Sequence, residues 1–573
     1  MFKKNTQHLQ PALISAISEL PEKHLKLLRG SWSESFYHDF FCEIDEDIFA
    51  VLYASEPSRP NVPVNVLTAL EVLKAGFGWS DEELFENFCF NLQVRHALGY
   101  DRLGDGDFAI RTLYYFRERL SKHYLETGIN LLEQVFCQVT DAQIQDLQVR
   151  TGMQRMDSTQ IASNIVNASR LQLLIEAIQR LHRILNEADQ DRLAETFAPY
   201  IQGTAGQYTY RVKGQQETLE HLCQVGAAID HLLIALKDGY ANEPAYQVLE
   251  RIFTENFKLV EEDIKPKERH ELGSGSLQSV DDLEASYRTK GKANFKGYAA
   301  NITETCDPEN ELQLVTKVQV SPNNIDDTKL LAEALPDLKE RTDLDTLYTD
   351  GGYGSRETDE VLAKENIQQI QTAIRGRKPS REKLHLSDFE ISQADNGRPT
   401  RITCPNQQIV EVQSTSQRKG FVAHFDRKTC LGCPYVEACP AKPGKRDPNR
   451  HLRFNQAQIN VSQRHRISQQ HLREGQNLRA AIESTVRQVK HPFPAGKLPV
   501  RGLFRVASMV IGSALMTNIR RIQQFRVEKS QQGQENKENQ ITSVFPVVSF
   551  SQFFRLIFDL LMLSSSNWVF LGC

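Results

Sequence analysis

The stretch LQLVTKVQVSPNNIDDTKLLAEALPDLKERTDLDTLYTDGGYG, residues 312–354, contains the clearest signal for the fold. From residue 312 to 320, Leu, Leu, Thr, Val and Val occupy alternate positions, which predicts a strand. Residues 328–340 then show helical spacing of apolar residues. A short second strand, 346–349, ends at Asp350, before two glycines. Strand, helix and strand in this order predict an α/β unit with a carboxylate at a strand end.

The composition limits the classes of protein to which the chain can belong. A length of 573 residues is too great for one ordinary domain, and 40% hydrophobic with 25% charged residues excludes wholesale disorder. Ten cysteines are too few for a disulfide scaffold. The first ten residues lack the apolar region of a signal peptide, and no uncharged apolar run reaches the length of a membrane span. We therefore expect a cytoplasmic protein with no membrane partner.

The charge distribution is uneven. Residues 441–530 contain 18 Lys plus Arg against 4 Asp plus Glu, although the net charge of the whole chain is −5. A long basic segment in an acidic protein indicates a polyanionic partner, most plausibly nucleic acid. The alternative is a solvated basic surface without a partner.

The remainder of the chain alternates between helical and extended patterns. Residues 1–145 have helical spacing, with Ser80 and Glu83 in a capping-box pattern and Asp107 as the expected N-cap of a helix from 108 to 120. Residues 148–163 then have an extended pattern that includes Asp157. A helical insertion follows at about 165–275.

The C-terminal part has a different character. We expect a loop-rich, Cys-rich insertion at about 376–460, and helices from 467 to 525 that are broken by three prolines. Residues 528–540, EKSQQGQENKENQ, have no core-forming side chain and predict a linker. The linker and an apolar tail, at most an amphipathic helix, would together occupy 528–573.

Three carboxylates have contexts that suit metal-dependent phosphodiester chemistry. Asp157 and Asp350 lie near the ends of expected strands, and Glu483 lies on an expected helix in the basic region. Two Mg²⁺ ions held about 3.5–4 Å apart by such oxygens stabilise the attacking and leaving oxygens of an in-line displacement. Each residue also has an ordinary interpretation, because Asp-Gly is common in turns, Asp157 could cap a helix, and Glu483 has Arg487 four residues on.

The helix of Glu483 favours the functional interpretation. Leu478, Ile482, Val486 and Val489 form its apolar face, whereas basic residues flank Glu483 on the adjacent face. A carboxylate within a basic stripe suits a metal ligand beside phosphate-binding groups. The predicted DNA-binding residues are Arg479, Arg487, Lys490, Lys497 and Arg501.

These residues carry a resemblance to a known family. The segments MDST at 156–159, YTDGGY at 348–353 and AIESTVR at 481–487, the last with Lys490, resemble the three catalytic motifs of the DDE transposases of bacterial insertion sequences. The resemblance extends over about 40–525. It implies an RNase H-like α/β catalytic core at 148–525, a mixed sheet flanked by helices, preceded by a helical N-terminal domain. The long helical insertion departs from the family pattern, and its role is open.

The resemblance also implies a mechanism and partners. Asp157, Asp350 and Glu483 would bind Mg²⁺ or Mn²⁺, and the enzyme would cut double-stranded DNA at the ends of a mobile element and join the freed 3′-OH to target DNA. We expect a homodimer on DNA, associated with the bacterial nucleoid. The alternatives are a structure-specific Mg²⁺-dependent endonuclease and a non-catalytic DNA-binding protein derived from a transposase.

Four cysteines form a second candidate site. Cys404, Cys430, Cys433 and Cys439 include one CxxC pair, and four thiolates suit a closed structural Zn²⁺ site. The strict double CxxC spacing is absent, so four reduced thiols are an equal alternative, and His451 is a substitute ligand. The other cysteines are scattered and are expected to be free thiols.

Overall fold

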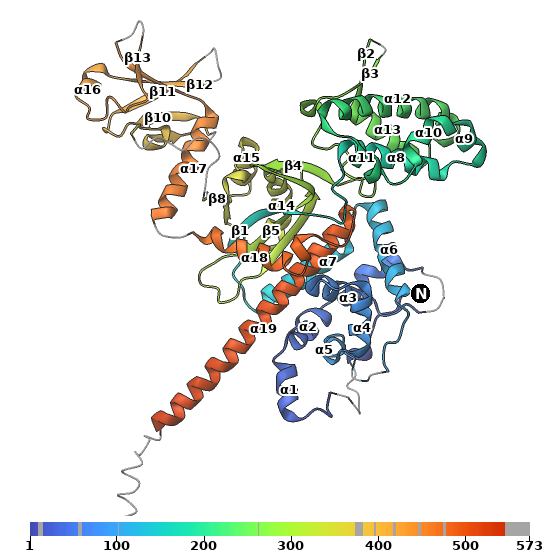
Figure 1. Cartoon of the computed structure of the whole chain (residues 1–573). Coiled ribbons are helices and arrows are strands. Elements are labelled where there is room, and N and C mark those ends of the chain that lie inside the picture. Colours follow the sequence, from blue (N-terminus) through green and yellow to red (C-terminus); the bar gives the residue numbers. More distant parts are fainter. Residues whose placement is uncertain are drawn as a thin grey trace, which may run out of the picture.

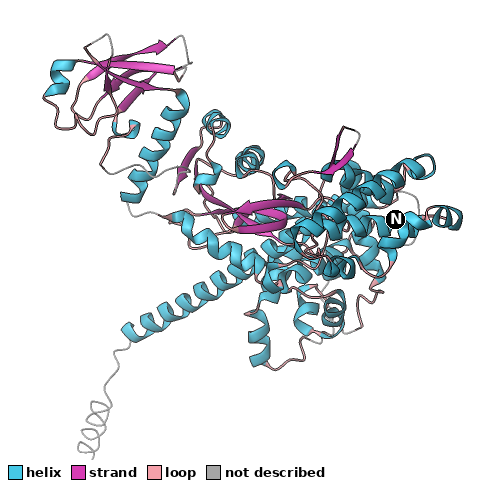
Figure 2. Ribbon diagram, turned by 45° about the horizontal axis from the view of Figure 1, so that its top comes forward, coloured by secondary structure: helices cyan, strands magenta, loops and turns pink. Residues whose placement is uncertain are grey.

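A computed structural model of the chain shows a mixed α/β protein. A mixed sheet lies in the middle of the molecule, next to a helical N-terminal region, and one helical and one strand-rich lobe extend from this body (Figures 1 and 2). The structure describes residues 1–9, 15, 17–54, 60–100, 102, 104–261, 263–372, 382–394, 397–415, 420–444, 448–473 and 477–544.

The N-terminal region is helical, as its spacing predicts. The capping box of Ser80 and Glu83 is present and begins α4. The prediction for Asp107 is wrong, because α6 begins at Arg111 with Ile110 at the N-cap position. The helices of this region are α1 (Glu22–Arg29), α2 (Trp32–Phe36), α3 (Val64–Phe77), α4 (Asp81–Phe90), α5 (Leu92–Ala97), α6 (Arg111–Thr127) and α7 (Leu131–Asp146).

The central sheet has the order β4-β5-β1-β7-β8, and β6 also pairs with β5. β5 is antiparallel to β1, β4 and β6, whereas β1, β7 and β8 run parallel. Helices α14 (Asp327–Arg341) and α15 (Arg356–Lys364) connect the later strands. The strands are β1 (Met153–Ile161), β4 (Ser286–Lys290), β5 (Ala293–Thr305), β6 (Val315–Pro322), β7 (Thr346–Thr349) and β8 (Gln368–Gln371).

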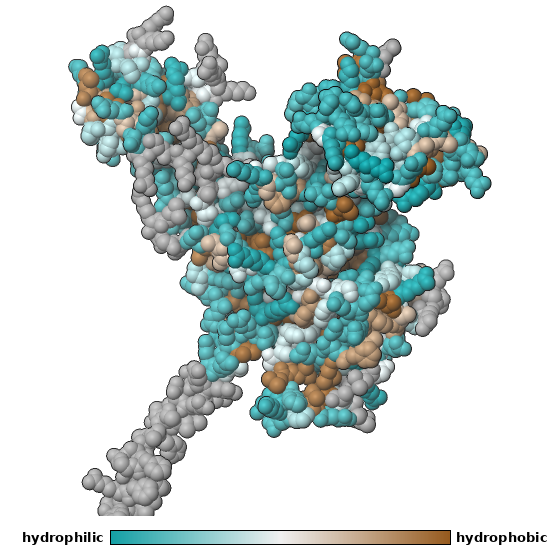
Figure 3. Space-filling view, in the orientation of Figure 1, coloured by the Kyte–Doolittle hydropathy of each residue, from teal (hydrophilic) through white to brown (hydrophobic). Residues whose placement is uncertain are grey.

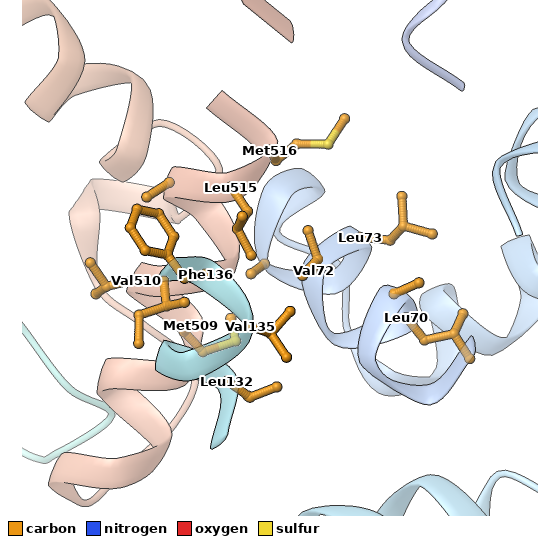
Figure 4. Close-up of a cluster of buried hydrophobic side chains, with 14 of the residues drawn as sticks. Leu70, Val72, Leu73, Leu132, Val135, Phe136, Met509, Val510, Leu515 and Met516 are labelled. Atoms are coloured by element: carbon orange, nitrogen blue, oxygen red, sulfur yellow. The ribbon is translucent and has the colours of Figure 1, made fainter. Parts of the chain in front are cut away.

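Helix α19 (Leu503–Val544) joins the N-terminal region to the sheet in one hydrophobic core. Figure 4 shows side chains of α3, α7 and α19 meeting, among them Val72, Val135 and Leu515. The helices approach closely because Gly512 lies against α3: a Cβ at this position would lie 2.8 Å from the Cβ of Ala75. The N-terminal helices therefore share a core with the sheet.

The predicted linker is wrong over its described part. Residues 528–540 continue α19, which extends from the body in Figure 1 and ends at Val544. This segment is rich in Gln, Glu and Lys, which favour helix even where nothing packs against them. Lys529 also pairs with Glu311 at 2.6 Å. The apolar tail, 545–573, lies outside the described residues.

The helical insertion forms the lobe that follows β1. Its helices surround a separate hydrophobic cluster, and the hairpin of β2 (Phe257–Val260) and β3 (Asp263–Pro266) extends from it. Figure 3 shows a largely hydrophilic face on this lobe. The helices are α8 (Arg170–Ile184), α9 (Glu187–Arg192), α10 (Ala194–Ile201), α11 (Ala205–Arg211), α12 (Gly214–Tyr240) and α13 (Pro244–Asn256).

Helix α12 is long and apolar enough to cross a membrane by length and composition alone. Its apolar side, which includes Val225, Ile229 and Leu236, is buried in the cluster of the insertion, and α12 contacts α8 and α13. The core of this lobe therefore accounts for part of the apolar composition of the helix, since 33% of its most apolar window is buried.

The Cys-rich insertion has more regular structure than its sequence predicts. It forms a six-stranded antiparallel sheet of order β13-β14-β12-β11-β10-β9, and α17 (Gln456–Arg473) leads from it back to the body. The elements are β9 (Glu390–Gln393), β10 (Pro399–Thr403), β11 (Ile409–Thr415), β12 (Gly420–Phe425), α16 (Arg427–Leu431), β13 (Lys442–Pro443) and β14 (Arg450–Phe454).

Candidate active site

The two aspartates lie on neighbouring parallel strands, but Asp157 lies in the middle of β1 and not at its end as predicted, whereas Asp350 directly follows β7. Strand β1 pairs with β7, and the last pair in the register is Arg155 with Tyr348. Asp157 and Asp350 each follow that pair by two residues, so the register brings them to the same position along the sheet. Asp350 accepts a 2.6 Å hydrogen bond from the backbone N–H of Gly352, which fixes the turn after β7. The structure thus brings together two residues that are 193 positions apart.

Glu483 lies in the first turn of α18 (Ile482–Lys490), which packs on β1. Its apolar face includes the buried Ile482 and Val489, as the spacing predicts. The side chain of Glu483 is 59% exposed, whereas that of Asp157 is 14% exposed. The third carboxylate therefore lies at the open side of the site.

A buried ionic network that the sequence analysis missed holds α18 against the strands. Glu304 on β5 is fully buried and accepts hydrogen bonds from Arg155 at 2.6 Å, Thr485 at 2.6 Å and Arg521 at 2.8 Å. Arg155 lies two residues before Asp157, and Thr485 lies two residues after Glu483. The network therefore sets the position of the helix that carries Glu483 relative to the strand that carries Asp157.

The guanidinium of Arg479 lies between the carboxylates. Arg479 is in the 3₁₀ turn η7 (Leu478–Ala481), and it contacts Asp157 at 2.8 Å and Glu483 at 3.5 Å. Burial lowers the pKa of Arg479, but the charges of Asp157, Asp350 and Glu483 outweigh this effect and the pKa is raised. One side-chain cation thus interacts with all three predicted catalytic residues.

The site has the character of a cation-binding site. Burial raises the pKa of Asp157, the Arg479 charge opposes this shift, and the neighbouring Asp350 charge adds to it. Crowded carboxylates that have to stay ionised need positive charge nearby, and their hard oxygens are the donors that Mg²⁺ and Mn²⁺ prefer. With Arg479 in place, no three His, Cys, Asp or Glu side chains among the described residues are close enough together to hold a metal ion. The carboxylate oxygens are donors that the predicted metal prefers. In this structure the guanidinium of Arg479 is the cation that contacts them.

Three of the five predicted DNA contacts are half-buried and bind other parts of the protein. Arg479 binds Asp157, and Lys490 donates a 2.9 Å hydrogen bond to the carbonyl of Gln160 on β1. Arg501 forms an ion pair with Asp281 at 3.1 Å. These contacts differ from the solvent-facing basic stripe that the helical spacing predicts.

The other two predicted DNA contacts remain accessible. Arg487 is exposed and lines a small hollow of about 290 Å³ with Arg520 and Arg521. Lys497 is exposed, and its Nζ donates to the carbonyl of Ile165. Neither has a carboxylate partner within the described residues, so both retain the charge needed for a phosphate contact.

The four cysteines share one neighbourhood in the strand-rich lobe. Burial raises the pKa of Cys430, and the nearby thiols of Cys439, Cys404 and Cys433 raise it further. Backbone N–H groups donate to the sulfurs of Cys404 and Cys433, each at 3.4 Å. In the part of the chain that the structure describes, these thiols do not form a ligand set, and the zinc site stays a prediction. His451, the predicted substitute ligand, packs edge-to-face on His424.

Comparison with known proteins identifies one segment. Residues 403–523 match a transposase DDE domain. The matching segment contains Glu483, Arg479 and the four cysteines, but neither Asp157 nor Asp350. No curated protein and no solved structure matches the chain. The match therefore covers the helix that carries Glu483. The pairing of β1 with β7 places Asp157 and Asp350, which lie outside the match, beside each other.

Proposed function

We propose that the protein is a DNA transposase of a bacterial insertion sequence, with an RNase H-like catalytic core. The observation that carries the proposal is the convergence of Asp157, Asp350 and Glu483 around one cationic group, from the middle of β1, the end of β7 and a helix. The transposase DDE match over 403–523 supports it, because it contains the Glu-bearing helix. A trio of carboxylates on two interior strands of a mixed sheet and an adjoining helix suits phosphodiester cleavage and transfer.

The roles of the residues follow from their positions. Asp157 and Asp350 would hold a divalent metal, Mg²⁺ or Mn²⁺, from the rigid strand β1 and the end of β7, and Glu483 would complete the site from its exposed position. The metal supplies charge stabilisation at the phosphate and activates the attacking oxygen. Arg479 would have to leave the carboxylates, and phosphate is its natural new partner.

The proposal also covers the partners and the location. The protein would bind double-stranded DNA at both the element ends and the target, as a homodimer, in the bacterial cytoplasm. The free charges of Arg487 and Lys497 support the DNA contact. The proposed chemistry uses water and then a DNA 3′-OH as nucleophiles, so it needs no covalent protein–DNA intermediate.

An assay on the DNA that flanks the gene tests the function. Purified protein with Mg²⁺ is incubated with a linear duplex that carries the terminal inverted repeat and with a supercoiled target plasmid. We expect a nick at the repeat end that leaves a 3′-OH, followed by joining of that end to the plasmid. Cleavage without joining would support the endonuclease alternative instead, and binding without cleavage would support the non-catalytic alternative.

We also propose that Cys404, Cys430, Cys433 and Cys439 bind one structural Zn²⁺ that stabilises the strand-rich lobe. The support is their shared neighbourhood and the N–H groups directed at two of the sulfurs. Such donors stabilise thiolates, and a closed four-thiolate site has no position for catalytic water.

Metal analysis tests the zinc site. We expect about one zinc per chain in protein purified without chelators, because one closed site takes one ion. The double variant Cys430→Ser, Cys433→Ser should lose it, whereas Cys223→Ser, which changes an exposed thiol in the helical insertion, should retain it. Absence of zinc from the wild-type protein would show that the four cysteines are ordinary reduced thiols.

A further inference from the structure

A second cationic site lies where the helical insertion meets the central sheet. A cavity of about 970 Å³ opens between the residues that follow β1, the start of α8 and the strands β4 and β5. Four of its lining side chains are positively charged: Arg170, Arg269, Lys296 and Lys497. None of the described residues that line it is Asp or Glu. A hollow lined by charge of one sign concentrates its field and attracts ions of the other sign.

The positive charges of the cavity are not neutralised by the protein. Arg170 donates to the side-chain and backbone oxygens of Asn256 and to the carbonyl of Lys267. Lys296 donates to the carbonyl of Ala168 at 2.9 Å, and Lys497 donates to that of Ile165 at 3.2 Å. All of these acceptors are neutral, and within the described ranges none of the four cations forms an ion pair with a carboxylate.

Burial makes the missing counter-charge costly. Arg170 and Lys296 are half-buried, and burial lowers the pKa of both groups. A partly buried cation without an anionic partner is unfavourable, and an incoming anion relieves this cost. The N-terminus of α8, capped by Ser169, also borders the cavity and adds the positive end of its helix dipole.

The cavity is within reach of DNA that occupies the active site. Its lining begins at Ala162, five residues beyond Asp157 along β1 and its extension. At about 3.3 Å per strand residue this separation is roughly 16 Å. One DNA strand advances about 3.4 Å per nucleotide, so a strand that ran along β1 from a phosphate at Asp157 would reach the cavity after about five nucleotides.

We propose that this cavity binds the phosphate backbone of the DNA strand about five nucleotides from the scissile phosphate. This inference rests on the proposed transposase function and gives the helical insertion a role: to grip DNA beside the cut. Lys and Arg contacts to phosphates fix the position of a duplex without reading its sequence. The hydroxyl of Tyr287, which also lines the cavity, suits the sugar-phosphate backbone.

The salt dependence of DNA binding tests this proposal in the full-length protein. Affinity for a 30-base-pair duplex is measured by fluorescence anisotropy at several NaCl concentrations. The slope of log K against log salt is negative, and each lost phosphate contact reduces its magnitude by about 0.9. We expect Arg269→Ala to reduce this magnitude by about 0.9, and Arg269→Ala combined with Lys296→Ala to reduce it by about 1.8. Arg269→Lys should keep the wild-type slope, because the charge is retained.

A matched control separates the cavity from general surface charge. Lys265 is an exposed cation on β3 of the same insertion and does not line the cavity. Lys265→Ala should keep the wild-type slope. Because Arg269 is exposed, Arg269→Ala tests the proposal without disturbing the fold even if the Lys296 variant is unstable.

The outcomes distinguish this inference from the proposed function. Wild-type protein that cleaves DNA, together with an unchanged slope for Arg269→Ala, would overturn the cavity proposal alone. If Lys265→Ala reduces the magnitude of the slope as much as Arg269→Ala does, the cavity proposal is also overturned. If the wild type binds no duplex and cuts none, the proposed function fails and this inference fails with it. If the cavity binds ATP, and variants of its cationic residues bind duplex DNA as the wild type does, the cavity is a site for a small anion and the proposal is overturned.

Discussion

Replacement of any one of the three carboxylates should lower DNA cleavage by about 10³-fold or more. Asp157→Asn, Asp350→Asn and Glu483→Gln keep the shape of each side chain but remove the charge that a divalent metal needs. Metal ions contribute several kcal/mol of charge stabilisation in the transition state, and about 4 kcal/mol corresponds to about 10³ in rate. DNA binding should persist, because Arg487 and the cationic cavity are unchanged.

The measurement is the initial rate of nicking at fixed Mg²⁺, with anisotropy as the check on binding. Asp345→Asn is the matched control, since this exposed aspartate precedes the same strand, β7, but lies at its opposite end. It should cleave at the wild-type rate. A carboxylate whose replacement leaves nicking near normal does not belong to the site.

Replacement of Glu304 should produce the largest loss of stability. In Glu304→Gln, the guanidinium groups of Arg155 and Arg521 would lose their shared carboxylate, and these side chains are only 10% and 19% exposed. Loss of one partner from a buried ionic network costs about 3–5 kcal/mol, because a charge remains without compensation. We expect the free energy of unfolding to fall by about this amount, and cleavage to fall with it because α18 loses its anchor on β1.

Urea titration monitored by tryptophan fluorescence measures this loss. Trp32 and Trp79 pack on the hydrophobic core that is shared with the sheet, so they report its unfolding. Glu309→Gln is the control, because Glu309 pairs with Arg150 at the surface and exposed pairs contribute less than about 1 kcal/mol. Equal effects of the two substitutions would show that the buried network does not position the site.

The sequence could predict that Asp350 directly follows a strand because its signal is local. A short apolar strand followed by Asp-Gly-Gly indicates a carboxylate at a strand end wherever it occurs in a chain. The network around Glu304 has no such signal, since its contacts depend on the pairing of β1 with β5, and Arg155 and Glu304 are 149 residues apart. Only the register of the folded sheet brings them together.

The basic residues were harder to predict for a geometric reason. Helical spacing places Arg479 in line with Glu483 and Arg487, but Arg479 lies in a 3₁₀ turn before α18 begins. A 3₁₀ turn has three residues per turn instead of 3.6, which rotates its side chains relative to those of the helix. The side chain of Arg479 accordingly points inward, where it contacts Asp157.

The strands of the Cys-rich lobe were missed because their hydrophobic contrast is small. Residues of β11 (Ile409–Thr415) alternate only between exposed and half-buried, so polar and apolar side chains share both faces. Prolines and glycines between these short strands also resemble those of irregular loops. Pairing in a small sheet, rather than residue pattern, determines the structure of this lobe.

If these carboxylates bind a metal as proposed, the position of Arg479 would make metal binding and DNA binding depend on each other. The guanidinium and the metal would compete for the same carboxylates, so metal alone would have to displace an attached cation. Phosphates from DNA offer the arginine another partner and thereby lower the cost of that displacement. By thermodynamic reciprocity, DNA then strengthens metal binding as much as metal strengthens DNA binding. Such a protein would hold its catalytic ions weakly until the correct substrate arrives, which limits damage to the chromosome that carries its gene.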